Sequence, residues 1–428
     1  MRNLFDIKLL FVILAFTACG EDRTYEYMEL TEETHWIFSK MKESYLWGDS
    51  IKNPQTKDFF ADNKVFYKNL LMKYDKSSYF EDSASLTSYG MSFAVMRDPI
   101  GIKPSNSYAL VLYVEPNSPA HVAGIKRGTW ISKVGGSNIT TSKYDMLERG
   151  KATTLYTNRI DVDDEGNYFW HEADSVEIDA ACELSTTSMY LDTVYNIQDT
   201  NVGYMVCNRF IDGVSKSEFA DVLSRFNASD VSEIIIDLRY NSGGPLREAV
   251  DCASLFVPSS YASEDVCAIL NNKGDSVTLS FGNETSLSDA EKIYILTTEA
   301  TRGAAEIYAI ALQRTLGSSV VKVLGMPTAG ESLITEPFTS PYGFNINPVT
   351  AQVYLADGSA VASDELRIDY QVDELSNIHS CHPLGSRQEY LLYNTLYHIV
   401  YGSLPMDKDD AAETAVKKYI PSEKPYSL

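Results

Sequence analysis

The sequence predicts a multidomain protein of mixed α+β and α/β class, with a helical N-terminal segment, a β-rich module and a large α/β core. Three observations predict this fold class. The 428 residues exceed the size of one typical domain. Aromatic residues recur at helical spacing before residue 85, and short strands with Gly/Pro turns follow. From about residue 156, strand–turn–helix units repeat, as in a parallel sheet covered by helices.

The first twenty residues, "MRNLFDIKLLFVILAFTACG", have a short basic start and an apolar run from Leu9 to Ala18. This run is too short to span a bilayer but suits a signal peptide. Cleavage before Cys19 would resemble bacterial lipoprotein processing, so residues 1–18 are predicted to be a lipoprotein signal peptide and Cys19 the lipidated residue. A plain secretory signal with an incidental cysteine is the alternative. Glu21 and Asp22 resemble the surface-export signal of Bacteroidetes lipoproteins, which predicts the bacterial cell envelope, at the outer membrane and exposed on the surface.

Composition excludes several classes of function. The formal net charge of −23 argues against nucleic-acid binding, which needs a cationic patch. It would also repel an anionic membrane, so attachment must come from the lipid. The five cysteines after Cys19 are widely spaced without a CxxC pair, which makes a zinc site unlikely to form. Cys207 and Cys252 lie in apolar stretches and are predicted to be buried free thiols. One disulfide bond in an oxidising compartment is the alternative. No metal and no cofactor is expected.

Residues 19–85 are predicted to form a helical domain. The segment "THWIFSKMKESYLW" repeats apolar residues at helical spacing, and Thr34 is expected to cap its start. A second helical pattern, "KVFYKNLLMKY", follows. The expected core residues are Trp36, Met41, Tyr45, Trp47, Phe66, Leu70, Leu71 and Tyr74.

Residues 86–155 are predicted to form the β-rich module. A strand over 109–114 is followed by a turn and a short helix, which Gly124 would end in the left-handed conformation. The stretch "TWISKVGGSNIT" then predicts a β-hairpin across Gly135 and Gly136. The motif "SPAHVAGIKRGTWISKVGG" resembles the PDZ domain family. That resemblance implies a loop of backbone N–H groups that captures a peptide C-terminus, with the peptide adding as a strand. The alternative is a purely structural module. The residues of that loop would include Gly90, Met91, Ser92 and Phe93.

Residues 156–428 are predicted to form the core. The stretch "EIIIDLRYNSGGPLREAVDCASLF" gives a strand and then a turn at Gly243-Gly244. "KIYILTTEATRGAAEIYAIALQRTL" repeats strand, turn and helix, and "SVVKVLGMPTAGES" adds a further strand and loop. Ligands of such sheets lie beyond the carboxyl ends of the strands. The double glycine, the turn at 301–306 and the loop at 325–331 should therefore converge on one crevice.

In this order, "DLRYNSGG", "PTAGE", "IDYQVDE" and "PLGSRQEYLLYNTLYHI" resemble the C-terminal processing (tail-specific) serine peptidases, in particular their Bacteroidetes lipoprotein branch. The resemblance implies a crotonase-like (ClpP/crotonase type) peptidase core. In that family a serine in the second turn attacks the scissile carbonyl and a buried lysine in the next loop takes its proton.

The resemblance places Gly303 in the nucleophile slot and Glu331 in the general-base slot. Both catalytic groups of the family are therefore missing. The backbone N–H groups that would hold the oxyanion fall at Gly243, Gly244 and Ala304.

The leading hypothesis is a lipid-anchored, catalytically inactive homologue that binds extended or C-terminal segments of peptides and proteins. The alternative, from a different class of function, is an active peptidase in which Thr301 serves as a displaced nucleophile. A purely structural role is a third. A metal site built from Glu299, Glu306 and Glu331 lacks an accompanying histidine.

Overall fold

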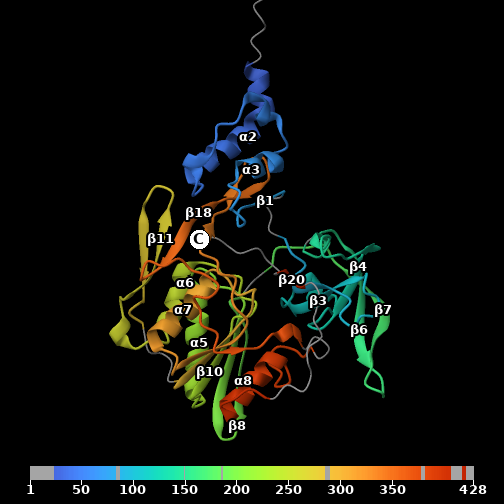
Figure 1. Ribbon diagram of the computed structural model, residues 1–428, viewed down its shortest axis with the longest axis vertical. Coiled ribbons are helices and arrows are strands. Elements are labelled where there is room, and N and C mark those ends of the chain that lie inside the picture. The colour runs from blue at the N-terminus through green and yellow to red at the C-terminus, as the bar shows by residue number, and fades with distance from the viewer. Residues whose placement is uncertain are drawn as a thin grey trace, which may run out of the picture.

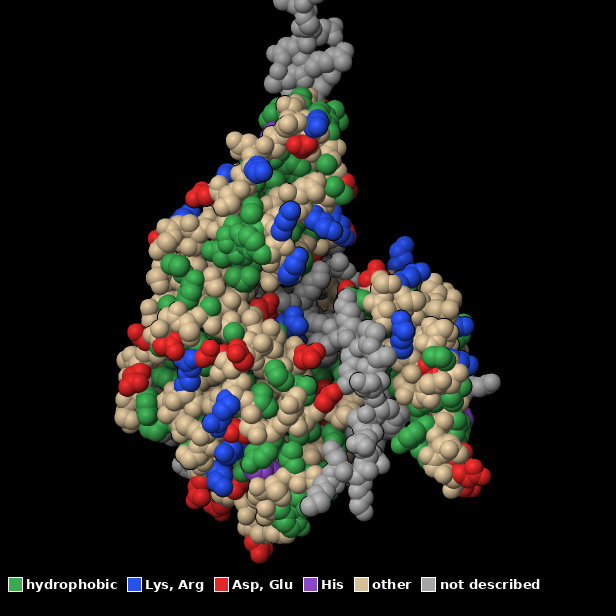
Figure 2. All heavy atoms as spheres, viewed as in Figure 1, with side chains coloured by type: hydrophobic (Ala, Val, Ile, Leu, Met, Phe, Trp, Pro, Cys, Tyr) green, Lys and Arg blue, Asp and Glu red, His purple; other side chains and the backbone are tan. Residues whose placement is uncertain are grey.

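The computed structural model shows three units: the N-terminal unit lies at one end of the long axis, and the β-rich module lies beside the core (Figure 1 and Figure 2). The predicted signal peptide, residues 1–18, and Cys19 lie outside the part of the chain that it describes. Within that part, no helix combines the length and the apolar character needed to cross a membrane. The described residues are 24–82, 87–148, 150–184, 187–284, 290–376, 381–405 and 417–420.

The N-terminal unit packs two helices, α2 (Thr24–Ser44) and α3 (Asn63–Leu70), around an aromatic core. The 3-10 turns η1 (Gly48–Ser50) and η2 (Thr56–Phe60) lie between them. Helix α2 begins ten residues earlier than expected, so the prediction that Thr34 caps it is wrong. The Thr34 hydroxyl instead donates to the Phe59 carbonyl and ties α2 to η2.

Most of the predicted N-terminal core is confirmed. Met41, Tyr45, Phe66 and Leu70 are buried, whereas Tyr74 is 61% exposed and does not belong to the core. The remaining predicted aromatic and leucine residues are partly buried against this cluster.

The core part of the chain completes the N-terminal unit. Strand β1 (Tyr79–Glu81) pairs with β17 (Asn345–Asn347), which pairs in turn with β16 (Phe338–Thr339). Phe344, Ile346 and Val349 join the aromatic cluster of α2 and α3. The N-terminal unit and the core are therefore held together by a shared sheet and a shared apolar cluster.

The β-rich module is one sheet with strand order β20-β2-β3-β4-β6-β7. It extends beyond the predicted boundary at residue 155, because β6 and β7 form a long antiparallel hairpin that continues this sheet. The expected hairpin across Gly135 and Gly136 is present, with positive φ at both glycines, as the turn of a two-residue hairpin requires. The bounds of its elements are β2 (Met91–Arg97), β3 (Ser107–Val114), α4 (Pro119–Val122), β4 (Trp130–Val134), β5 (Ser137–Asn138), η3 (Asp145–Leu147), β6 (Thr153–Val162), β7 (Tyr168–Ile178) and β20 (Lys417–Ile420).

The core is built on a sheet with strand order β19-β14-β13-β10-β9-β8, in which all neighbours are parallel except β8 and β9. Alternate residues of β10 face opposite sides, as the pleat requires. Ile234 and Ile236 pack with the helices α5, α6 and α7, whereas Ile235 packs with α8. The bounds are β8 (Met189–Ile197), β9 (Thr200–Cys207), α5 (Ser215–Ala228), β10 (Glu233–Asp237), α6 (Leu246–Ser254), β13 (Lys292–Thr297), α7 (Ala304–Leu316), β14 (Val321–Gly325), β19 (Tyr370–Gln371) and α8 (Tyr390–Tyr401).

A second antiparallel sheet, β12-β11-β18-β15, lies between the core helices and the N-terminal unit. The five cysteines of the described chain are all free thiols, and Cys207, Cys252 and Cys267 are buried, as expected for the first two. The bounds of the remaining elements are η4 (Ser259–Tyr261), β11 (Asp265–Asn271), β12 (Ser276–Ser280), β15 (Leu333–Thr335) and β18 (Val349–Leu355).

A buried network of charges joins the β-rich module to the core. Arg127, on the loop before β4, donates from Nη2 to Glu374 (3.1 Å) and Glu389 (3.0 Å). Arg239, which follows β10, donates from Nη1 to the same two carboxylates at 3.1 and 2.6 Å. Burial by itself would raise the pKa of Glu389, but Arg239 and Arg127 lower it to about 2. The two units are therefore connected by paired buried charges and not only by apolar contact.

Candidate functional site

Three loops meet at the carboxyl edge of the core sheet. The strands β10, β13 and β14 are parallel neighbours, so the loops that follow them emerge at the same edge. A Cβ atom built on Gly303 would lie 3.9 Å from Glu331 Oε2 and 4.0 Å from Gly243 Cα. The structure thus brings together the two predicted dyad slots and the first residue of the double glycine.

Gly303 stands at the start of α7 with φ 56° and ψ −119°. Side chains of L-residues rarely adopt this conformation, which costs on the order of 1–3 kcal/mol, whereas glycine reaches it freely. Nothing lies within 3.4 Å of the position that a Cβ atom would take. A side chain at residue 303 would therefore be strained through its backbone but would fit the available space.

The predicted oxyanion donors differ in their availability. The Gly243 N–H donates to the Asn241 Oδ1 atom at 2.9 Å, so Asn241 already uses it. The N–H groups of Gly244 and Ala304 make no hydrogen bond with any described residue. A Cβ atom on Gly243 would lie 3.4 Å from the Ala304 nitrogen, so the double glycine lies against the first turn of α7. Two free backbone donors are thus held close together at this edge.

Only glycine fits at residue 244. Its φ is +125°, and a Cβ atom there would come within 2.1 Å of the Phe210 carbonyl oxygen. The loop after β9 therefore packs directly onto the double glycine and fixes where the Gly244 N–H points.

Glu306 holds two of the three loops in place. Its Oε2 atom accepts from the Gly303 N–H (2.8 Å) and the Glu331 N–H (2.9 Å). Its Oε1 atom accepts from the Thr328 hydroxyl (2.5 Å) and the Gly330 N–H (2.6 Å). Burial raises the pKa of Glu306, although these four donors act in the opposite direction. This carboxylate connects the turn before α7 to the loop after β14, and so sets the spacing of the two dyad slots.

The Glu331 carboxyl group accepts no hydrogen bond from any described residue. Burial raises its pKa; the Arg302 guanidinium opposes this shift and Glu306 adds to it. Burial thus disfavours the charged form of this carboxyl group, and the nearby guanidinium partly offsets that effect.

Two threonine hydroxyl groups near the crevice are used inside the loops. Thr301, the alternative nucleophile, is fully buried; its hydroxyl donates to the Leu238 carbonyl (2.9 Å) and accepts from the Thr298 N–H (3.0 Å). The Thr328 hydroxyl donates to Glu306. Among the described residues, no hydroxyl group is hydrogen-bonded to the Glu331 carboxylate. The geometry therefore does not present Thr301 to a substrate.

The acidic residues of this region do not gather into a metal site. Glu299 is exposed and Glu306 is saturated by its four donors. Across the described residues, no group of three or more His, Cys, Asp or Glu side chains could hold a metal ion.

The predicted peptide-binding loop leads into β2. Gly90 has φ +79°, and its N–H donates to the Ser88 hydroxyl oxygen at 2.9 Å. Met91 and Ser92 begin β2 and pair with β3. Phe93 pairs with β3 on one side and with Ile420 of β20 on the other. The edge of β2 that would receive an added strand is thus already paired with a strand of the same chain.

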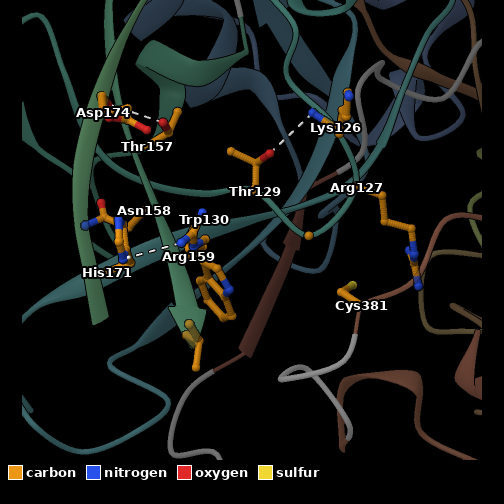
Figure 3. Close-up of a pocket in the computed structure, with 12 residues that line it drawn as sticks. Lys126, Arg127, Thr129, Trp130, Thr157, Asn158, Arg159, His171, Asp174 and Cys381 are labelled. Atoms are coloured by element: carbon orange, nitrogen blue, oxygen red, sulfur yellow. Dashed lines mark hydrogen bonds between the residues drawn. The ribbon is translucent and has the colours of Figure 1, made fainter. Parts of the chain in front are cut away.

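A separate cavity of about 430 Å³ lies on the β-rich module (Figure 3). Its lining includes Lys126, Asn158, His171 and Asp174, and none of the predicted site residues. Figure 3 shows the Arg127 side chain extending away from Thr129 and Trp130, toward its partners in the buried network. This cavity is therefore distinct from the crevice at Gly303.

Sequence reasoning considered Glu306 only as part of a metal site and did not assign it a structural role. A glutamate three residues after the residue that begins a helix has the spacing of a capping box, and the Gly303 N–H does donate to it. That signal was available. The bond from the Gly243 N–H to Asn241 has the i, i+2 form of an Asx turn, a second local signal that was not used.

This geometry defines a class of protein: a peptidase-type core with a glycine-lined crevice at the carboxyl edge of its sheet, joined to a β-rich module. Residues 201–372 match the family model described as "Peptidase family S41", so this part of the chain is similar to that family.

Relatives and solved structures agree with this assignment. The carboxy-terminal processing protease CtpA of Bacillus subtilis is 26% identical over 293 residues, which cover 66% of this chain and 58% of that protein. The chain thus spans little more than half the length of this relative. A structure from Bacteroides fragilis described as an S41 protease is 26% identical, covers 86% of this chain and 97% of its own, and has a TM-score of 0.68. The photosystem II D1 C-terminal processing protease shares the fold, with 17% identity over 85% and 99% of the two chains and a TM-score of 0.52.

Proposed function

We propose that this protein is a catalytically inactive, lipid-anchored member of the S41 family that binds extended or C-terminal peptide segments. The observation that carries the proposal is the nucleophile slot at the start of α7. It holds Gly303, and no hydroxyl of the described residues is hydrogen-bonded to the Glu331 carboxylate opposite.

The chemistry follows from these two positions. Removing a serine nucleophile from such a site costs several orders of magnitude in rate. Glu331 does not restore activity in place of the lysine, because no hydroxyl group of the described residues is hydrogen-bonded to it for it to activate. The scaffold keeps its form, since Glu306 and the double glycine hold the loops without the catalytic groups.

Two features support peptide binding. The free N–H groups of Gly244 and Ala304 lie at the amino end of a 13-residue helix, where a carbonyl or carboxylate oxygen is stabilised. The Arg302 side chain lies close enough to act on the pKa of Glu331, and adds positive charge at the same place. The module that resembles a PDZ domain would receive a peptide on β2, at the edge that β20 occupies in this structure.

The chain direction supports an anchor at the N-terminal end. Helix α2, which begins five residues after Cys19, lies at one end of the long axis, far from β8 and α8 (Figure 1). A lipid on Cys19 would hold the molecule by this end with its crevice away from the membrane. Cys19→Ser should move the protein from the membrane fraction to the soluble fraction.

The deciding experiment restores the family's dyad. The native protein, incubated with unfolded casein and an amine-reactive readout, should release no new amino groups. The double variant Gly303→Ser with Glu331→Lys should gain measurable activity, because a Cβ atom fits at residue 303. Its matched control is Gly303→Ala with Glu331→Lys, which carries the same backbone strain without a hydroxyl. A folded but inert Ser/Lys variant would contradict the assignment of the two slots. Native turnover abolished by Thr301→Ala would establish the alternative, an active peptidase.

A further inference from the structure

The strand-receiving edge of β2 is occupied by a segment from the other end of the chain. Strand β20 (Lys417–Ile420) runs antiparallel to β2 and is the outermost strand of the module's sheet. Figure 1 shows it on the side of the module that faces the core. The register pairs Phe93 with Ile420, Ala94 with Tyr419, Val95 with Lys418 and Met96 with Lys417.

This pairing has the form of strand addition by a peptide. In that mode the peptide's main chain completes the sheet, and affinity comes largely from backbone hydrogen bonds. The paired stretch starts at Phe93, the last residue of the predicted peptide-binding loop. Beyond Ile420 the antiparallel direction leads along β2 toward Gly90. The segment therefore lies where an incoming peptide would have to lie.

We propose that residues 417–420 are a built-in occupant of the peptide edge of β2, so that external peptides bind only by displacing this strand. This rests on the proposed function, because it takes β2 as the peptide-binding strand. The partner is the chain's own segment "KKYI", and an external ligand must offer an extended backbone that competes with it.

The local physics favours this occupant. The β2 residues from Phe93 to Met96 are fully buried, and an open edge on such an apolar strand invites pairing with other chains. Tyr419 and Ile420 are residues favoured in strands. A strand of the same chain that covers this edge prevents such pairing. The cover is reversible, because only four residue pairs hold β20 on β2.

The connection to the core sets the strength of the competition. Helix α8 ends at Tyr401 and β20 begins at Lys417. The residues between them can span at most about 50 Å when extended. A tether of this length gives the segment an effective concentration on the order of 1 mM. If the free segment binds β2 with a Kd of about 0.1 mM, competition from the tethered segment lowers the apparent affinity of an external peptide about tenfold.

Disulfide trapping tests the register. In a Cys182→Ser background, the directly opposed pairs are Ala94→Cys with Tyr419→Cys and Val95→Cys with Lys418→Cys. One of the two must be the closer, non-hydrogen-bonded type. The offset pair, Ala94→Cys with Lys418→Cys, is the matched control, because a one-residue shift places the side chains on opposite faces. Mild oxidation should crosslink an opposed pair within one chain and leave the control reduced. Equal crosslinking of the control, or a crosslink between two chains, would overturn the proposal.

A binding assay on the full chain tests the competition. The probe is a fluorescent peptide of residues 413–424, followed by polarisation. Replacing Lys418 and Tyr419 by proline removes backbone donors and breaks the strand, so this variant should bind the probe about tenfold more tightly than the native chain. A variant with two prolines at Ala411 and Ala412, before the strand, should behave as native. Equal affinity for native and variant, or no binding to the variant, would refute the inference.

Foreign peptides separate this inference from the proposed function. If a panel of unrelated C-terminal peptides binds the native chain and the proline variant equally, the proposed function stands and the built-in occupant does not. If the 413–424 probe binds the variant while no foreign peptide binds either protein, the occupant stands and the proposed function fails.

Discussion

Replacing Arg127 by methionine should separate the β-rich module from the core. Arg127 and Arg239 together face the carboxylates of Asp237, Glu374 and Glu389, so this cluster carries one excess negative charge. Without Arg127 the excess becomes two, in a place where the side chains of Glu374 and Glu389 are 4% and 1% exposed.

The magnitude follows from the contacts. Breaking a buried ion pair by removing one partner costs about 3–5 kcal/mol, because the remaining charge is buried without compensation. Arg127 also donates to the carbonyls of Leu112 (2.7 Å) and His382 (2.9 Å), each worth about 1 kcal/mol. We therefore expect Arg127→Met to lower the free energy of unfolding by about 5–7 kcal/mol and the Tm by roughly 6–8 °C.

Chemical denaturation at pH 7 measures the loss, and limited proteolysis between the units reports whether the module has separated. The neighbouring Lys126 is exposed, so Lys126→Met removes the same charge without touching the network and should stay within about 0.5 kcal/mol of native. The pKa of Glu389 is about 2, so its stabilising contribution is present above the unfolded value of 4.5 and is lost as the pH falls toward 2. If Arg127→Met and Lys126→Met have the same free energy of unfolding at pH 7, the buried network does not hold the module to the core.

Two further predictions concern the crevice, both with exposed Glu299→Gln as the control. In Glu306→Gln, the new amide nitrogen would face two of the four hydrogen-bond donors. The free energy of unfolding, measured by chemical denaturation, should therefore fall by about 2–4 kcal/mol. A loss below about 1 kcal/mol would show that the carboxylate does not hold the loops. The pKa of Glu331 is raised by burial, so its contribution to stability is present below the unfolded value of 4.5 and is lost as the pH rises through the folded value. Glu331→Gln should therefore raise the Tm at pH 8 relative to native but not at pH 4, and an equal change at both pH values would contradict this reasoning.

Much of the crevice could be predicted from the sequence, because its determinants are local. The strand after which each loop emerges is visible as an apolar run, and parallel neighbours bring their carboxyl ends to one edge. That reasoning placed Gly243, Gly303 and Glu331 in the same crevice, and the structure brings them together. The start of α2 could not be read in the same way. Its first ten residues are mostly polar, so apolar spacing gave no signal before Thr34.

Long-range pairing explains the other differences. The β6–β7 hairpin belongs to the module because β6 pairs with β4, a choice that local patterns do not encode. Arg127 pairs with Glu389, which is far away in the sequence, and β20 and β2 are separated by an even longer stretch of sequence. Such contacts depend on how the units dock, so a motif such as "KRGT" indicates a turn but not the partners of its arginine.

The arrangement around Gly303 shows that the form of this site and its chemistry depend on different residues. Glu306 sets the distance between the two loops through four hydrogen bonds, and Gly244 fixes the donor loop by contact with Phe210. Neither interaction involves the side chain at residue 303 or the carboxyl group of Glu331. Glycine even relieves the backbone strain that a serine with φ near +56° would carry. Under the proposed function, the absence of a nucleophile at residue 303 removes no support from the crevice, so peptide binding is compatible with an inactive site.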